Sequence, residues 1–149
     1  KTLWSIIKMR TRELSALLKK HKDTRNVFKG VYPCDKIPKS LPNYSAIIAN
    51  TDPSGKPGRH WVAYFFNPTH VYFFDSYGKA PWKKELQEPM IMRKRKKYFG
   101  RRLQGSSQVC GQYCIYFILA MIKGWGFKRF GNQLNQNDML VKKIVSHHF

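Results

Sequence analysis

The segment that most constrains the fold is a run of apolar residues between positions 109 and 123. The run has no polar stripe, and Gly124 follows it at a place where helices commonly end. A helix that is apolar on nearly every side must lie in the centre of a core, because it has no face to turn toward water. We therefore predict a central helix over residues 109–123. Its continuous apolar stretch is Ile115, Tyr116, Phe117, Ile118, Leu119, Ala120, Met121 and Ile122.

Two aromatic-rich stretches, residues 60–66 and 71–75, have the composition of β-strands. The four residues between them, 67–70, include Asn and Pro and have the composition of a turn. This order predicts an antiparallel hairpin in which Phe66 faces Val71.

The same hairpin brings a histidine and a carboxylate together. In this register Asp75 lies opposite Val62, and His60 lies on the same face, diagonal to Asp75. Diagonal Cβ atoms are roughly 7 Å apart, which is within reach of these two side chains. Asp75 can then hold one ring nitrogen of His60 and fix its tautomer, as the carboxylate of a catalytic triad does. Taken singly, each residue has a structural explanation, as a histidine at a strand start and an aspartate at a turn.

The remaining segments supply further helices and a strand. One amphipathic helix, or two short ones, ends near His21, a buried strand occupies residues 45–50, and another helix covers residues 136–147. Residues 27–44 are rich in proline and are predicted to be irregular. Residues 83–103 are predicted to form a helix plus a loop.

These elements predict one α+β domain over residues 1–149, with helices around a small, mostly antiparallel sheet. Residues 1–9 are expected to be an upstream extension of that domain.

Cys110 begins the predicted central helix. A thiol at a helix N-terminus lies in the positive field of the helix dipole, which favours the nucleophilic thiolate. The small and polar residues 103–109 can bring a glutamine amide beside the thiol as an oxyanion donor, and Gln104 and Gln108 are both candidates. A small buried residue at a helix start is the alternative explanation for Cys110. Cys114, one turn later, is expected to be a core residue.

Positive charge dominates the composition. Lysine and arginine number 28 against 8 acidic residues, for a formal net charge of +20. A charge of this size repels itself in a compact state and predicts a polyanionic partner such as nucleic acid. A solvated face or a nuclear-localisation signal is the alternative for the densest cluster. That cluster is Arg93, Lys94, Arg95, Lys96, Lys97, Arg101 and Arg102.

Three cysteines in 149 residues predict reduced thiols rather than a disulfide scaffold. Cys110, Cys114 and a histidine lack a fourth ligand, so no zinc site is predicted. No stretch of about 18 apolar residues occurs, so no membrane-spanning helix is expected.

Several positions, in chain order, resemble the adenovirus protease (adenain) family and the wider group of ubiquitin-like-protein proteases that share its fold. These positions are His60-Trp61, Asp75, Gln104 and Cys110-Gly111. The cysteine comes last in this order, whereas it comes first in papain-like enzymes. Residues 46–51, 73–78 and 110–114 also look like segments of the adenovirus type. The resemblance covers most of the chain from about residue 10 onward.

The resemblance implies a role for each of these positions. Cys110 is the nucleophile, His60 the general base and Asp75 the acid that orients the base. Gln104 and the backbone N–H of Cys110 form the oxyanion hole. The SUMO-protease pattern places its glutamine six residues before the cysteine, where Gln104 stands.

The implied reaction is amide hydrolysis through an acyl-enzyme. Family substrates carry glycine near the scissile bond, and Trp61 and Gly111 are expected to contact them in a narrow cleft. A purely structural core role is the alternative for Trp61.

The resemblance implies a monomeric viral cysteine endopeptidase. It would cleave capsid or core precursor proteins during virion maturation, in the host nucleus and the virion. Its source would be a DNA virus or a Polinton-type element. The family uses double-stranded DNA as a non-specific activator, and the basic residues 93–102 are the expected site for it. The family's activating peptide is attached by a disulfide, but residues 82–103 contain no cysteine. A peptide activator is therefore expected only as a noncovalent strand.

Two other functions fit the same residues. One is a deubiquitinase or SUMO-type protease that cleaves after Gly-Gly. The other is a basic DNA-binding packaging protein with an inactive protease fold. Thiol reactivity, and activity on a ubiquitin-like protein, distinguish the three.

Overall fold

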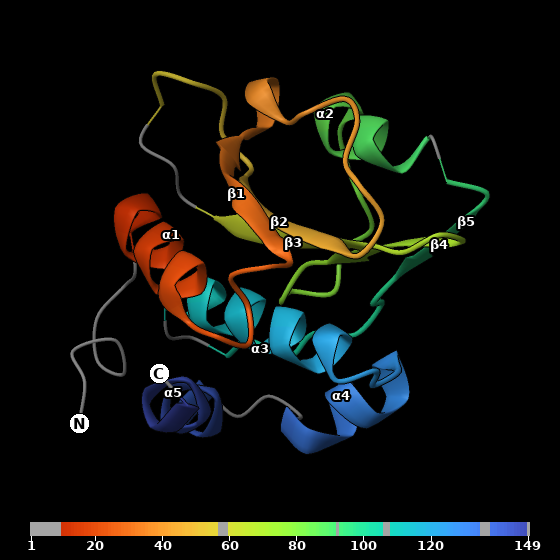
Figure 1. The fold of residues 1–149 in the computed structure, drawn as a ribbon. Coiled ribbons are helices and arrows are strands. Elements are labelled where there is room, and N and C mark those ends of the chain that lie inside the picture. The colour runs from red at the N-terminus through yellow and green to blue at the C-terminus, as the bar shows by residue number, and fades with distance from the viewer. Residues whose placement is uncertain (1–9, 57–59, 92, 106–107, 135–137, 149) are drawn as a thin grey trace.

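One five-stranded sheet runs through the middle of the molecule, with its strands in chain order (Figure 1). The three inner strands are β2 (Ser45–Asn50), β3 (Trp61–Phe66) and β4 (His70–Phe74). The edge strands are β1 (Phe28–Pro33) and β5 (Arg95–Tyr98). Strand β3 pairs antiparallel with β2 and β4, whereas each edge strand pairs parallel with its neighbour.

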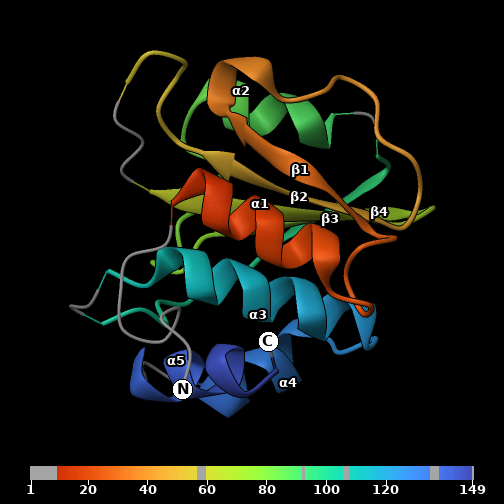
Figure 2. The same cartoon turned by 60° about the vertical axis from the view of Figure 1, so that its left-hand side comes forward.

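Helices cover both faces of this sheet. On one face lie α1 (Thr11–Lys20) and α3 (Cys110–Ile122), with α4 (Phe127–Leu134) and α5 (Asp138–His148) beyond α3 (Figures 1 and 2). The opposite face carries the short helix α2 (Lys84–Gln87) and the 3-10 turns η2 (Cys34–Lys36) and η3 (Glu88–Met90).

This computed structural model describes residues 10–56, 60–91, 93–105, 108–134 and 138–148. The predicted extension, residues 1–9, lies outside the described residues. None of the helices in these ranges is long and apolar enough to cross a lipid bilayer.

The inner strands are buried on both sides, because each face of the sheet has its own apolar core. In β2, Ala46 and Ile48 pack toward α3, while Ile47 and Ala49 pack toward α2. The aromatic residues of β3 divide between the two cores in the same alternating way. This two-sided burial explains why β2 and β3 have nearly continuous apolar sequences.

The main predictions of secondary structure are confirmed. Helix α3 begins at Cys110, is buried over most of its length and is followed by Gly124 with a φ of +80°. The hairpin has the predicted register, with Phe66 paired to Val71 and Ala63 paired to Phe74. The α+β class is also confirmed.

The sheet is mixed rather than mostly antiparallel, because both edge strands pair in parallel with their neighbours. The sequence analysis did not predict these two strands. Parallel pairing needs a long crossover, and residues 34–44 and 75–94 provide one on each side of the hairpin. Strand β1 contains Gly30 and ends at Pro33, so its composition predicted irregular structure. Its register also shifts between Phe28 and Gly30. Strand β5 exposes all four side chains, so it carries no apolar alternation. The short helix α4 was not predicted either.

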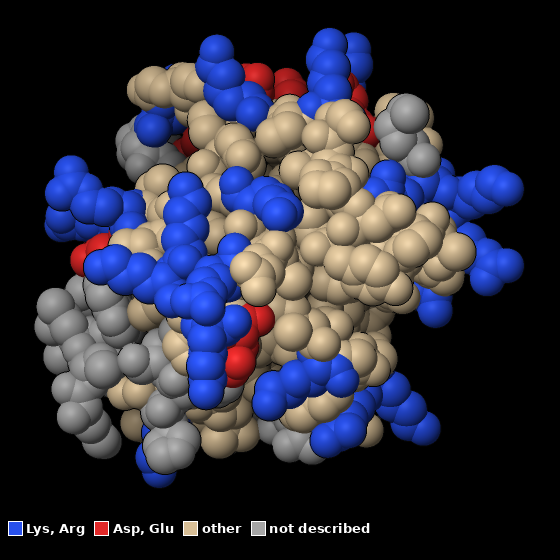
Figure 3. Space-filling model, in the orientation of Figure 1, with Lys and Arg blue, Asp and Glu red and all other residues tan. Residues whose placement is uncertain are grey.

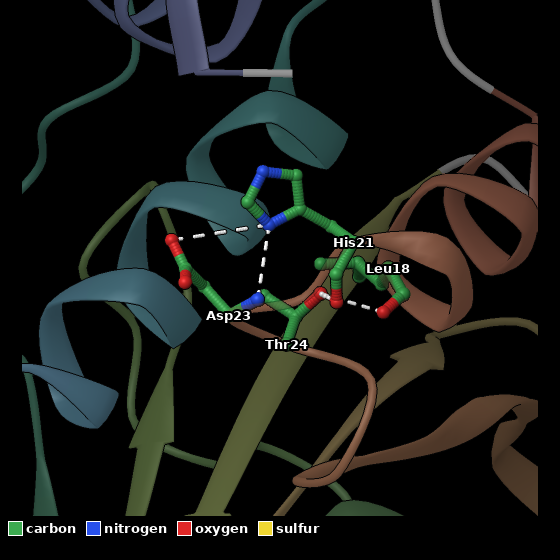
Figure 4. Close-up of polar contacts among 4 residues, drawn as sticks. All are labelled: Leu18, His21, Asp23 and Thr24. Carbon is green, nitrogen blue, oxygen red and sulfur yellow. Dashed lines mark hydrogen bonds and ion pairs between the residues drawn. The ribbon is translucent and has the colours of Figure 1, made fainter.

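Figure 4 shows how α1 ends and the chain turns toward β1. The Nδ1 of His21 accepts a hydrogen bond from the Asp23 backbone N–H at 3.1 Å and lies 3.9 Å from the Asp23 carboxylate. The buried Thr24 hydroxyl donates to the Leu18 carbonyl at 2.6 Å. A carbonyl of the last helical turn is thereby satisfied.

Gly78 is the point where the turn after β4 meets the segment that leads to α3. Its φ is +79°, and a Cβ at this position would lie 2.5 Å from the carbonyl carbon of Arg101. We expect Gly78→Ala to lower the free energy of unfolding by about 2–5 kcal/mol, because left-handed φ costs about 1–2 kcal/mol and a clash with fixed atoms about 1–3 kcal/mol. Chemical denaturation measures the loss.

Gly55→Ala is the matched control for this prediction. Gly55 has a φ of +84° but open space around its Cβ position. Only the backbone cost of about 1–2 kcal/mol applies there. Equal losses in the two variants would show that the close approach at Gly78 contributes nothing.

Candidate functional site

His60 and Asp75 meet across the hairpin, in the geometry that the turn predicts. His60 precedes β3, Asp75 follows β4, and Nε2 of His60 lies 2.5 Å from Oδ1 of Asp75. The Asp75 side chain is fully buried. Its Oδ2 accepts a hydrogen bond from the Lys79 backbone N–H at 3.1 Å. The carboxylate is therefore fixed through both oxygens, and Nδ1 remains as the ring nitrogen that can face a nucleophile.

The surroundings of His60 favour its protonated form. Burial lowers the pKa of His60, but hydrogen bonds to Asp75 and to the Cys110 side chain, together with the charge of both partners, raise it from 6.5 to about 9. The ring can therefore carry a proton at neutral pH. A group with this property can both accept a proton and return one to a leaving group.

Cys110 is the first residue of α3, and its side chain helps to raise the pKa of His60 through hydrogen bonding and charge. Its location places the sulfur in the positive field at the N-terminus of a 13-residue helix. Cys34, Cys110 and Cys114 are all free thiols. Burial raises the pKa of Cys114 well above that of an ordinary thiol, so Cys114 remains a protonated core residue. Within the described ranges, no group of three or more His, Cys, Asp or Glu side chains is placed to hold a metal ion.

Of the two candidate glutamines, Gln104 has the side chain fixed inside the protein, whereas Gln108 is exposed. The Oε1 of Gln104 accepts a hydrogen bond from the Ser76 hydroxyl at 2.5 Å. The Ser76 carbonyl accepts the backbone N–H groups of Leu103 and Gln104 at 2.8 and 2.9 Å. Because Ser76 engages the oxygen end of the amide, the donor end of the Gln104 side chain is its NH₂ group. Ser76 directly follows Asp75, so one turn holds both the orienting acid and the predicted oxyanion donor.

Further contacts fix the loop that carries Gln104. The Gly105 N–H donates to Oδ1 of Asp138 at 2.8 Å, and the Tyr113 hydroxyl lies 2.8 Å from the same oxygen. The Arg102 Nε donates to the Gln104 carbonyl at 2.8 Å. These hydrogen bonds connect the loop to α3 and to the first residue of α5.

Trp61 and Gly111, which are predicted to contact substrate, are both buried. Trp61 is 3% exposed and belongs to the core beside α3. Its indole N–H has no hydrogen-bond partner among the described residues. Contact with substrate remains a prediction for both residues.

Some residues of the predicted basic cluster make hydrogen bonds to backbone carbonyls, whereas others extend into solvent. Arg93 donates hydrogen bonds to the carbonyls of Asn67 and Leu41 at 3.1 and 3.3 Å, and Arg102 is bound to the Gln104 loop. Figure 3 shows Lys and Arg side chains projecting from the side of the molecule where β5 lies in Figure 1. Apart from Arg102, which is also exposed, the cations of the cluster that project into solvent are Lys94, Arg95, Lys96, Lys97 and Arg101.

Two aromatic residues beside His60 were missed by the sequence analysis. The Tyr77 ring stacks on the imidazole at a centroid distance of 5.0 Å, and the Trp82 ring lies 6.5 Å away. Their position in the sequence, shortly after Asp75, could have indicated this contact. The turn that places Asp75 beside His60 also places the residues that follow it near the same ring.

No protein-family model matches this chain. A protein of Acanthamoeba polyphaga mimivirus that is assigned as a thiol protease is 36% identical to it over 124 residues, which cover 75% of this chain and 40% of the relative. A cysteine protease of African swine fever virus is 27% identical over 125 residues, or 72% of this chain and 46% of the relative. The chain is similar in sequence to viral cysteine proteases. It spans less than half of the length of either relative.

A crystal structure of the African swine fever virus protease has the same fold. The two structures align with a TM-score of 0.53 at 23% identity, over 70% of this chain and 42% of the other. The α+β fold predicted from the resemblance is therefore that of a viral cysteine protease. These comparisons support the resemblance to viral cysteine proteases as a group, and none of these relatives is an adenovirus protease.

The pKa of His60 provides a direct test of the site. We expect Asp75→Asn to lower this pKa from about 9, because a neutral amide cannot stabilise the imidazolium by charge. The ring then loses its proton at a lower pH than in the wild type. Titration of the His60 ring by NMR measures the shift.

Asp23→Asn is the control, since the Asp23 carboxylate faces His21 instead. The His60 titration should not change in that variant. An unchanged titration in Asp75→Asn would mean that the carboxylate does not set the protonation of His60.

Proposed function

We propose that this chain carries the catalytic centre of a viral cysteine endopeptidase. The observation that carries the proposal is the imidazole of His60, which the fully buried Asp75 holds at 2.5 Å and whose pKa the Cys110 side chain helps to raise. The fixed amide of Gln104 supports it, because acyl transfer needs a donor for the developing oxyanion. The similarity to viral cysteine proteases supports it independently.

The residues of the site can perform each step of amide hydrolysis. Cys110 gives its proton to His60, and the sulfur attacks the carbonyl carbon of the substrate. The Gln104 side chain and the Cys110 backbone N–H donate hydrogen bonds to the oxyanion. The C–N bond then breaks, and His60 gives its proton to the leaving amine. Water attacks the resulting thioester, with His60 accepting a proton, and releases the carboxylic acid and the free thiol.

The confined space around the nucleophile supports glycine-containing cleavage sites. Cys110 is 4% exposed and the neighbouring Trp61 only 3%, so large side chains next to the scissile bond would meet protein atoms. We propose that the substrates are capsid or core precursor proteins, cleaved in the host nucleus and the virion by a monomeric enzyme. All three thiols are buried, so an activating peptide would bind without a disulfide.

We further propose that double-stranded DNA stimulates the enzyme. The formal net charge of +20 and the five exposed cations on and around β5 support a phosphate-binding surface. Phosphate contacts of this kind carry no sequence preference.

The nucleophile can be identified by covalent labelling. A Gly-Gly peptide electrophile should label the wild type on Cys110 at neutral pH, as mass spectrometry would show. Cys110→Ala should abolish labelling, and His60→Ala should slow it by about 10²-fold or more. Cys114→Ala is the matched control, since Cys114 lies one turn away on the same helix, and it should label normally.

Hydrolysis separates catalysis from simple thiol reactivity. Gln104→Ala should lower peptide hydrolysis by about 10²- to 10³-fold but leave alkylation by iodoacetamide unchanged, because alkylation forms no oxyanion. Gln108→Ala should change neither. A wild type that is unreactive with and without DNA would refute the protease and favour a DNA-binding protein with an inactive fold. Preferred cleavage of a ubiquitin-like protein after Gly-Gly would favour the SUMO-type protease instead.

DNA binding should depend steeply on salt. Five phosphate contacts predict a slope of about −4 to −5 for the logarithm of the binding constant against the logarithm of salt concentration. Lys96→Ala with Lys97→Ala should reduce the slope by about 2, as measured by fluorescence anisotropy with duplexes of unrelated sequence. Lys142→Ala with Lys143→Ala, on α5, is the control. Hydrolysis that DNA does not accelerate would refute its role as an activator.

A further inference from the structure

The leaving group of the proposed reaction must pass beside His60. The imidazolium gives its proton to the departing amine, so the residues after the scissile bond lie next to this ring. Asp75 holds one nitrogen of the ring, and 17% of the His60 side chain is exposed. Side chains that flank the ring are therefore placed to contact the leaving-group side of a substrate.

Two aromatic rings flank His60. Tyr77 stacks on the imidazole at 5.0 Å with an interplanar angle of 28°, and Trp82 is tilted by 34° at 6.5 Å. Tyr77 is half-buried, whereas Trp82 is 43% exposed. A large part of the indole is thus open to a ligand directly beside the proposed general acid.

The protein fixes the position of Trp82. Its ring meets Phe73 edge-on, at 6.5 Å and 77°. The neighbouring Pro81 carbonyl accepts a hydrogen bond from the Gln87 amide at 3.0 Å, and the Lys83 ammonium donates to the carbonyl of Thr51. An aromatic surface that is already ordered loses little conformational entropy when it binds a ligand.

Positive charge borders this aromatic surface. The Lys79 ammonium lies 5.7 Å from the centre of the Trp82 ring, and Lys79 is exposed. The Arg102 guanidinium lies 4.6 Å from the centre of the Tyr77 ring. A ligand on these rings therefore meets cations and gains from carrying a carboxylate.

We propose that Trp82, Tyr77 and Lys79 form the subsite for the residues that follow the scissile bond, and that this subsite takes an aromatic side chain followed by an acidic one. The aromatic side chain stacks on Trp82, and the carboxylate pairs with Lys79. This inference rests on the proposed protease function and adds the side of the substrate that these residues recognise.

Two kinds of probe separate recognition by the subsite from the reactivity of the nucleophile. A Gly-Gly electrophile with nothing on the leaving-group side reports on Cys110 alone. Peptides with Gly-Gly followed by Phe-Glu or by Ala-Lys report on the subsite. The wild type should prefer the Phe-Glu peptide in kcat/KM by about tenfold. Trp82→Ala should lose about five- to tenfold in kcat/KM for the Phe-Glu peptide relative to the Ala-Lys peptide.

Lys79→Glu tests the charge without changing a packed residue. It should reverse the preference between Glu and Lys at the second position after the scissile bond. Lys79 is exposed, so we expect Lys79→Glu to fold normally. It therefore tests the subsite even if Trp82→Ala does not fold.

Trp125→Ala is the matched control. Trp125 follows the far end of α3, and the Arg129 guanidinium lies 4.2 Å from its ring centre, so it is another aromatic ring beside a cation. This variant should keep wild-type labelling and wild-type selectivity. Wild-type selectivity in both Trp82→Ala and Lys79→Glu would overturn the subsite and leave the protease intact. A wild type that neither labels nor hydrolyses would overturn the protease itself.

Discussion

The hydrogen bond between the buried Asp75 carboxylate and the His60 ring is the interaction on which the rest of the site depends. A carboxylate with no exposure to water needs strong partners, and here it has the imidazole at 2.5 Å and a backbone N–H at 3.1 Å. The turn that begins at Asp75 also supplies Ser76, which fixes the amide of Gln104. The turn that begins at Asp75 therefore fixes both the His60 ring and the Gln104 side chain, the residues proposed as general base and oxyanion donor.

Helix α3 provides the other half of the site. Its apolar sides pack against the sheet on one side and against α5 on the other, so its N-terminus has little freedom to move. Cys110 is placed at the positive end of the helix dipole, and its side chain helps to raise the pKa of His60. The same burial that holds the nucleophile also restricts access to it. We expect recognition to extend to exposed rings such as Trp82 because the space around the sulfur is small.

Much of this arrangement could be predicted from the sequence. The four-residue turn defined the hairpin register, and the register predicted the contact of His60 with Asp75. The apolar run predicted α3 and placed Cys110 at its start. The edge strands could not be predicted, because β1 contains Gly30 and β5 is a basic segment with all four side chains exposed. Their pairing comes from backbone hydrogen bonds, of β1 to β2 and of β5 to β4, which leave no apolar pattern in the side chains.

The sequence by itself determined the α+β class, the central helix and the residues that meet across the hairpin. It did so because burial leaves a local signal, which is a continuous apolar run in the central helix and aromatic-rich stretches on either side of a turn in the hairpin. Only the tertiary structure fixed the side chain of Gln104 against Ser76 while it left Gln108 exposed, engaged Arg93 in hydrogen bonds with Asn67 and Leu41, and brought Trp82 beside His60. Those outcomes depend on contacts between segments far apart in the chain, such as Ser76 with Gln104, which no local pattern encodes.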